Sequence, residues 1–136
     1  MLDTSSHLWA GAQSHLSFPS QLVIQKPPIL SDRAKLRGIA EVGGRCVKEF
    51  SRNPSMADLF RLGREFALAT GLAQGKVKDA MDAATPYGHC TMAMLGNSIF
   101  AMGQVDPLDA IMKGMGAQRY RCKVDQKGAR LLTPGR

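Results

Sequence analysis

The sequence contains few of the residues that build disulfide frameworks, metal sites or aromatic stacking platforms. Its 136 residues include 3 cysteines, 3 histidines and only 6% aromatic residues. Cys46, Cys90 and Cys122 are odd in number and far apart, and none belongs to the C-x-x-C or Cys/His pattern of a zinc site. We therefore expect free buried thiols, no metal site and a location in the reducing cytoplasm.

Long hydrophobic runs are also missing. No stretch reaches the roughly 20 apolar residues of a transmembrane helix. The first residues do not resemble a secretory signal, because they lack a basic start and Asp3 interrupts their apolar character. These absences predict a protein that does not enter a membrane.

Motifs for nucleotide binding and hydrolysis are incomplete. The stretch "GLAQGKV" at residues 71–77 has too few residues between its glycines for a Walker A loop, and Val77 stands where Ser or Thr would bind magnesium. His89 and Cys90 are neighbours in a β-rich stretch, where successive side chains point to opposite faces and cannot exchange a proton directly. We therefore assign no catalytic residue.

The charge is strongly positive, with a net charge of +7 and a pI near 9.7. Nucleic acid, an anionic surface or an acidic small molecule would all suit this charge. The densest basic region comprises Arg119, Arg121, Lys123, Lys127 and Arg130. Stacking partners are sparse there, with Tyr120 on the opposite side of the predicted strand, so a solvated strand face is favoured over an RNA platform.

The first residues differ in character from the rest of the chain. Residues 1–20 show no steady period, and we expect an irregular tail followed by one domain over residues 21–136. "QLVIQ" at residues 21–25 predicts a brief edge strand, which Pro27 and Pro28 end.

Three helices are expected next. Ser31 or Asp32 caps the first, which runs to Phe50, while Ser55 caps the second, which Gly71 ends. The third runs from about Gln74 to Ala84. The apolar positions expected to face the core are Leu36, Ile39, Gly43, Cys46, Val47, Phe50, Leu59, Leu62, Phe66, Ala67, Val77, Ala80 and Met81.

The second half turns to strands. "HCTMAM" and "SIFAM" flank a turn at Leu95-Gly96-Asn97, and Asp106 is expected to cap a helix that has Pro107 in its first turn and ends at Gly114 or Gly116. "RYRCKV" alternates as a half-solvated strand, "DQKG" forms a turn and "ARLL" a closing strand. The order predicts an α+β domain, with helices packed on one face of a small antiparallel sheet.

Several stretches together resemble the C-terminal half of archaeal pantoate kinases, within the GHMP kinase superfamily. They are "VIQKPPILSDRAKLRGI", "CVKEFSRNPSMADLFRLGREFALATGLAQGKVKDAMDAA", "GHCTMAMLGNSIFAMG" and "YRCKVDQKGARLL". The resemblance covers roughly residues 22–132 in the family's order, with "REFALATGL", "MAMLGNSIFA" and "GARLL" as its most specific parts.

This resemblance implies an ATP- and Mg²⁺-dependent kinase that converts pantoate to 4-phosphopantoate for coenzyme A synthesis. It also implies that the loop between two strands supports the phosphate-binding region. The implied loop residues are Gly88, Met92, Ala93, Met94, Leu95, Gly96, Asn97 and Ser98. Backbone N–H groups at Gly96 and Asn97 and the hydroxyl of Ser98 suit an anion.

The family's N-terminal lobe, which binds most of the triphosphate and magnesium, has no counterpart in this sequence, so we expect the chain to be inactive alone. It would work with that missing lobe or as a homo-oligomer, and its docking surface would include Met92, Met94 and Phe100. A free-standing ligand-binding or regulatory domain is the alternative. An RNA-binding domain that uses the basic strand is a third, weaker hypothesis.

Overall fold

The computed structural model describes residues 7–12, for which it gives the backbone alone, and residues 31–93, 98–116 and 118–131. The elements are β1 (His7–Ala12), α1 (Arg33–Phe50), α2 (Met56–Ala69), α3 (Gly75–Ala84), a 3-10 turn (Thr85–Tyr87), β2 (Gly88–Met92), β3 (Ser98–Gly103), α4 (Val105–Gly114) and β4 (Gln118–Lys123). Within these ranges, no helix is both long and apolar enough to cross a membrane.

The four strands form one antiparallel sheet in the order β2-β3-β1-β4. β1 lies inside the sheet, where Leu8 pairs with Met102 of β3 and with Cys122 of β4. The prediction of an irregular tail is therefore wrong for His7–Ala12. The reason is that pairing on both sides satisfies the backbone of this short segment, and such pairing leaves no local period in the sequence. The predicted strand at residues 21–25 and the domain boundary at residue 20 lie outside the described residues.

The helix boundaries follow the capping residues. Asp32 Oδ1 accepts hydrogen bonds from the backbone N–H of Ala34 at 3.0 Å and of Lys35 at 3.2 Å. Ser55 Oγ accepts one from the backbone N–H of Asp58 at 3.0 Å, which confirms both predicted caps. Gly71 follows α2 with a φ of 70°, the left-handed conformation that often ends a helix.

The start of α4 differs from the prediction. Gln104 is its N-cap residue, whereas Asp106, the expected cap, lies in the first turn. An acidic side chain there still interacts favourably with the positive end of the helix dipole. α4 ends at Gly114, one of the two expected positions.

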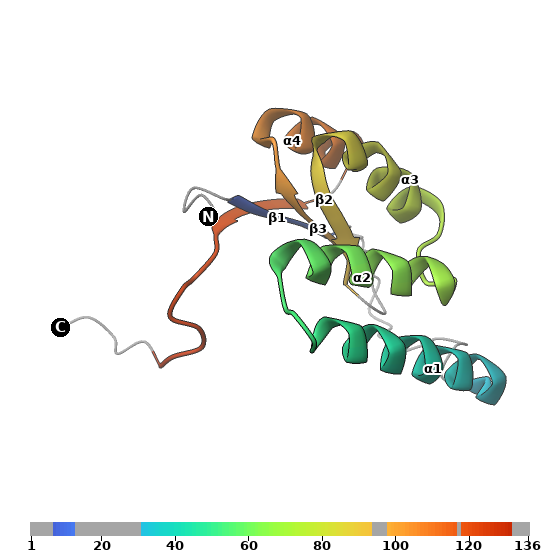
Figure 1. Cartoon of the computed structure of the whole chain (residues 1–136). Coiled ribbons are helices and arrows are strands. Elements are labelled where there is room, and N and C mark those ends of the chain that lie inside the picture. Colours follow the sequence, from blue (N-terminus) through green and yellow to red (C-terminus); the bar gives the residue numbers. More distant parts are fainter. Residues whose placement is uncertain (1–6, 13–30, 94–97, 117, 132–136) are drawn as a thin grey trace.

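The core lies between the sheet and the helices α3 and α4 (Figure 1). Cys90 of β2 pairs with Ala101 of β3, and both side chains pack with the apolar residues of the two helices. The largest fully buried side chains are Met81, Ile99, Leu108 and Met112. The α+β class with an antiparallel sheet is confirmed. The helices do not all lie on one face as predicted, because α2 packs on the Thr91 side of β2, opposite the α3/α4 core.

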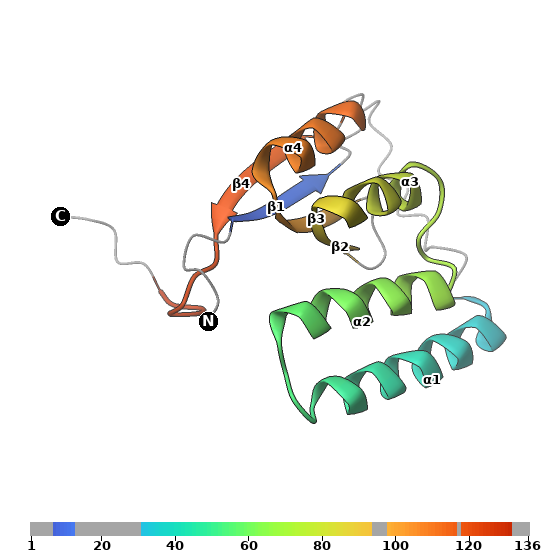
Figure 2. The same cartoon turned by 45° about the horizontal axis from the view of Figure 1, so that its top comes forward.

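The helices α2 and α1 form a second layer, beside β2 and away from α3 and α4 (Figure 2). Gly63 of α2 packs against Thr91, and the ring of Phe60 lies 6.0 Å from that of His89. Because Thr91 and His89 alternate with Cys90 along β2, α2 contacts the side of the strand that faces away from the α3/α4 core.

Three positions expected in the core are exposed in this second layer. Leu36 is 37% exposed, Leu59 is 51% exposed and Val47 is 66% exposed, while Phe60, which the helical stripe left out, is buried. The reason is that α1 packs mainly against α2, so part of the apolar stripe on each helix stays uncovered by the described residues.

The final strand is more exposed than predicted. Every residue of β4 is exposed, including Tyr120 at 55%. The turn after it is confirmed, since Asp125 Oδ1 accepts a hydrogen bond from the backbone N–H of Lys127 at 2.9 Å. Residues 129–131 form no strand, so the expected closing strand is wrong for that part, and residue 132 lies outside the described residues.

Candidate functional site

The predicted phosphate-supporting loop lies at the end of the β2–β3 hairpin. Met92 ends β2 and is buried, and Ser98 begins β3. The backbone N–H of Ala93 donates a hydrogen bond to the carbonyl of Ser98 at 2.9 Å, which closes the hairpin. The structure thus brings Met92, Ala93 and Ser98 together, while residues 94–97 lie outside the described part and their role stays a prediction.

Gly88 lies at the other end of the hairpin. It pairs with Gly103, separated from the loop by the length of β2, about 13 Å at the usual rise of a strand. A Cβ added at Gly88 would lie 2.3 Å from the carbonyl oxygen of Met102. The need for glycine there is steric and local to the strand pair, so Gly88 is not brought together with the other loop residues.

A hollow of about 500 Å³ lies between α2, the β2–β3 hairpin and the segment after β4. We call it the hairpin hollow. Its lining residues are Met56, Leu59, Phe60, Gly63, Thr91, Met92, Phe100, Lys123, Val124 and Asp125. Its volume falls within the range of small-molecule sites, roughly 300–1,000 Å³, and its walls are mainly apolar as such sites usually are.

The hairpin hollow contains one buried polar group with no partner. Thr91 is 8% exposed, and its Oγ1 makes no hydrogen bond to any residue that the structure describes. A Cβ added at Gly63 would lie 3.0 Å from this oxygen, so α2 packs closely against the hydroxyl. The sequence analysis did not single out Thr91, because its only signal there is one hydroxyl side chain in an otherwise apolar strand.

Charged groups lie at one side of the hairpin hollow, where the chain leaves β4. Asp125 is already engaged, because it is ion-paired with Arg130 and accepts the hydrogen bond from Lys127. Lys123 has no ion pair with any described residue. The register of the sheet places Lys123 on the opposite face from Thr91, because it lies three residues after Tyr120, which shares the face of Thr91.

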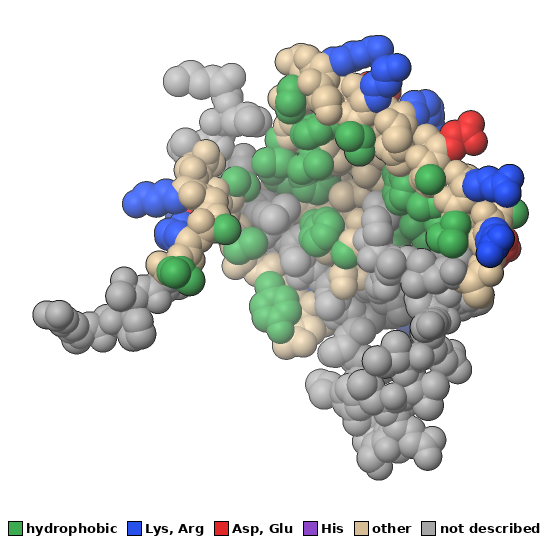
Figure 3. Space-filling view, turned by 90° about the horizontal axis from the view of Figure 1, so that it is seen from below, with side chains coloured by type: hydrophobic (Ala, Val, Ile, Leu, Met, Phe, Trp, Pro, Cys, Tyr) green, Lys and Arg blue, Asp and Glu red, His purple; other side chains and the backbone are tan. Residues whose placement is uncertain are grey.

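A second, shallower hollow of about 330 Å³ lies between α1 and α2. It shares Leu59 and Gly63 with the hairpin hollow and is lined by apolar residues and glycine throughout. On the face seen from below, hydrophobic side chains gather in the middle, and Lys and Arg side chains lie near the edge of the described surface (Figure 3). Of the residues expected at a docking surface, Phe100 is half-buried, Met92 is buried and Met94 lies outside the described part.

The two buried cysteines are unsuited to nucleophilic catalysis. Cys46 and Cys90 are buried free thiols as expected, whereas the expectation of burial is wrong for Cys122, which lies on the exposed strand β4. Burial raises the pKa of the Cys90 thiol to about 12, so it is protonated at neutral pH. No group of three or more His, Cys, Asp or Glu side chains within residues 31–93, 98–116 and 118–131 is arranged to hold a metal ion.

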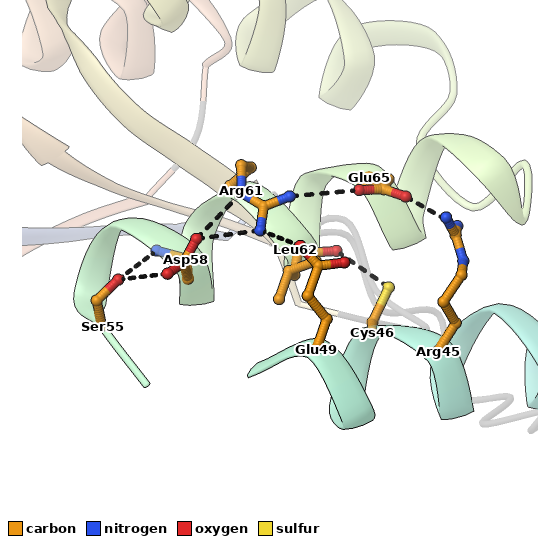
Figure 4. A network of polar contacts seen from close by, with 8 residues as sticks. All are labelled: Arg45, Cys46, Glu49, Ser55, Asp58, Arg61, Leu62 and Glu65. Carbon is orange, nitrogen blue, oxygen red and sulfur yellow. Dashed lines mark hydrogen bonds and ion pairs between the residues drawn. The ribbon is translucent and has the colours of Figure 1, made fainter. Parts of the chain in front are cut away.

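A polar network joins α1 to α2 (Figure 4). The Arg61 guanidinium lies 2.6 Å from Glu49 of α1 and 3.0 Å from Asp58, and Arg45 of α1 lies 2.8 Å from Glu65. Hydrogen bonds from Ser55 and then Arg61 lower the pKa of the Asp58 carboxyl below its usual range. Each of these charges is paired, and the Arg61–Glu49 and Arg45–Glu65 pairs join α2 to α1, so the network positions α1 rather than offering a site.

Comparison with known proteins gives two similarities and no matching family model. The chain is 28% identical over 81 residues to the pantoate kinase of Methanocaldococcus jannaschii. The aligned residues make up 60% of this chain and 30% of that enzyme. A solved structure described as a phosphotransferase related to the CoA biosynthesis pathway matches 91% of this chain with a TM-score of 0.65 and 18% identity. That match covers 39% of the solved chain, so this sequence spans well under half the length of either protein.

Proposed function

We propose that this chain is the C-terminal lobe of a pantoate kinase, acting in the cytoplasm in coenzyme A biosynthesis. The observation that carries the proposal is the agreement of two independent similarities, one in sequence to a pantoate kinase and one in fold to a phosphotransferase of the same pathway. The paired β2 and β3 strands support it, because they place Met92, Ala93 and Ser98 at one hairpin end, where the loop of the resemblance is expected.

In this proposal, ATP and Mg²⁺ bind mostly to the other lobe of the kinase. In support, the described residues contain no group of three or more His, Cys, Asp or Glu side chains that could hold a metal ion. The stretch at residues 71–77 is not a phosphate loop, because it lies between α2 and α3, with Gly71 ending one helix and Gly75 beginning the next. Nucleotide and metal would therefore be held by the other lobe, in the same polypeptide or in a second chain, and residues 1–136 alone would not phosphorylate pantoate.

In this proposal the chain helps to position the reacting groups and does not itself neutralise the charge on the phosphates. Phosphoryl transfer depends mainly on holding the acceptor and the phosphates in line and on neutralising charge. The hairpin is held from one side by the α3/α4 core and from the other by α2, so Met92, at the end of β2, is held at the wall of the hairpin hollow. A rigid support of this kind is what a lobe lacking its own metal site offers to an active centre.

The test is to isolate the chain from the cells that make it under mild conditions and to identify its partners by mass spectrometry. We expect a stoichiometric partner, or a longer form of the chain, that carries a Gly- and Ser-rich phosphate loop. A folded chain that is isolated alone would contradict the proposal. It would favour a free-standing ligand-binding domain, for which the hairpin hollow is the supporting observation.

A further inference from the structure

We propose that the outer edge of β4 binds an extended, acidic segment of another protein, which adds a further strand to the four-stranded sheet. The segment would alternate acidic and apolar side chains. This inference goes beyond the proposed function and does not depend on it, because it is argued from the exposure, charge and side-chain pattern of the edge strand.

The first support is the open edge. Among the described strands, β2 and β4 form the two edges of the sheet, and β4 pairs with β1 on one side. No described strand pairs with its other side, and all six of its residues are exposed (Figure 2). The edge strand β2 differs, because its second half is buried and packs against α2 and α3. An edge strand directs unpaired N–H and C=O groups outward, so β4 offers a row of backbone donors and acceptors.

The second support is the charge on this strand and on the segment after it. Residues 118–131 contain five basic residues and one acidic residue, which gives a net charge of +4 out of +7 for the whole chain. The acidic residue, Asp125, is engaged by Arg130, whereas Lys123 has no ion pair with any described residue. An acidic partner would therefore meet an excess of positive charge along this edge.

The third support is the pattern of side chains across β4. Arg119, Arg121 and Lys123 point to one face of the strand. Tyr120, which is 55% exposed, points to the other. The Arg119 guanidinium lies 3.3 Å from Asp109 of α4, so the basic face is the one beside α4. Because side chains opposite each other on paired strands interact, an added strand would place acidic residues beside the basic ones and apolar residues beside Tyr120.

The same features disfavour two other occupants. Two copies of the chain that pair antiparallel through β4 about a twofold axis would place basic side chains opposite basic side chains, which is destabilising. Lysine on an edge strand commonly prevents such pairing. A nucleic acid would offer phosphate oxygens to the N–H groups but would not use the outward C=O groups, and its bases would find Tyr120 on the opposite face from the basic residues.

The experiment is an NMR titration of the ¹⁵N-labelled full chain with a synthetic peptide that alternates glutamate and valine over six residues, the length of β4. One control peptide has the same composition with glutamates and valines in two separate blocks, and another replaces glutamate by lysine. With the alternating peptide we expect saturable shifts and slower amide hydrogen exchange in β4. Binding of the block peptide should be about fivefold weaker, because its side chains face the wrong neighbours, and the lysine peptide should not bind.

Backbone pairing is tested within the peptide itself. Successive amides of an extended strand point to opposite edges, so one alternate set would face β4 and the other set would face solvent. N-methylation of one set should abolish binding, and N-methylation of the other set should leave it unchanged. Equal effects of the two sets would contradict strand addition.

Variants of the chain test the charge contact. Lys123→Gln should weaken binding of the alternating peptide about two- to fivefold, the contribution of one exposed ion pair. Lys127→Gln is the matched control, because it removes the same charge from an exposed lysine that lies after the strand. Both lysines are exposed, so neither change should disturb the fold.

The inference is overturned if the alternating peptide causes no saturable shifts in β4, because the charged edge would then only protect the sheet from pairing. Equal binding of the block peptide, or equal binding by Lys123→Gln and Lys127→Gln, would also overturn it. Shifts in β4 that grow with the concentration of the chain itself would assign the edge to a second copy. Saturable shifts with a single-stranded oligoribonucleotide but not with the peptide would assign it to nucleic acid. None of these results decides whether the chain has a kinase partner, so the proposed function stands or fails separately.

Discussion

Replacing Thr91 by Val should stabilise the folded chain, although most substitutions at buried positions are destabilising. The Thr91 hydroxyl is buried, and none of the described residues accepts or donates a hydrogen bond to it. Leaving such a group unsatisfied costs about 1–3 kcal/mol, and a methyl group of similar shape avoids that cost.

The expected gain in free energy of unfolding is about 1–2 kcal/mol, which raises the urea midpoint by roughly 0.5–1 M at an unchanged m-value. Thr70→Val is the matched control. Its hydroxyl donates to the carbonyl of Phe66 at 2.7 Å, so the same change there should lower stability by about 1 kcal/mol. The reasoning is refuted if both variants lose stability equally, because Thr91 would then have a partner of its own.

Three further outcomes follow from the same structure. Gly88→Ala should unfold the hairpin or lower stability by several kcal/mol, because its Cβ would lie 2.3 Å from the carbonyl oxygen of Met102. Circular dichroism and urea titration measure this change, and a folded, equally stable variant would contradict the prediction. In the native chain at pH 7.5, Cys122 should react with a thiol reagent, while Cys90 should react only after unfolding. Rapid modification of Cys90 would contradict its burial and its pKa of about 12. Hydrogen bonds from Lys78 and then Arg64 lower the pKa of Asp82, so its stabilising contribution is present above the ordinary pKa and is lost as the pH falls through the lower folded value. Asp82→Asn should therefore reduce the loss of stability on acidification below about pH 4, and an unchanged acid profile would show that the pairing contributes nothing.

The helices were predictable from the sequence because their signals are local. Asp32 and Ser55 cap α1 and α2 with their own side chains, and Gly71 ends α2 in a left-handed conformation. The core-facing positions Val77 and Met81 of α3 recur at the helical period and are buried as expected. These features depend on residues a few positions apart, so one sequence is sufficient to find them.

Strand β1 and the hairpin hollow were not predictable in the same way. His7–Ala12 becomes a strand because β3 and β4, about ninety or more residues later, pair with it on both sides. The hairpin hollow combines side chains from α2, β2, β3 and the segment after β4. Thr91 is unremarkable along the chain, and its importance depends on Gly63 and on the lack of a partner in the fold.

The exposed stripe of α1 shows a further limit of periodicity. The spacing of Val47 and Phe50 correctly places a helix, but it does not say what covers each part of the apolar face. In the described structure α2 covers part of it and Val47 stays 66% exposed. An apolar surface of this kind is consistent with a chain that works against a further lobe.

The most direct test of the central claim is to measure 4-phosphopantoate by mass spectrometry after incubation of this chain with ATP, Mg²⁺ and pantoate, with and without the lobe or partner isolated with it. We predict product only when both parts are present, and none from residues 1–136 alone. Magnesium-dependent product from the chain alone would contradict the assignment of nucleotide and metal to the other lobe. No product from the complete assembly would contradict the kinase itself.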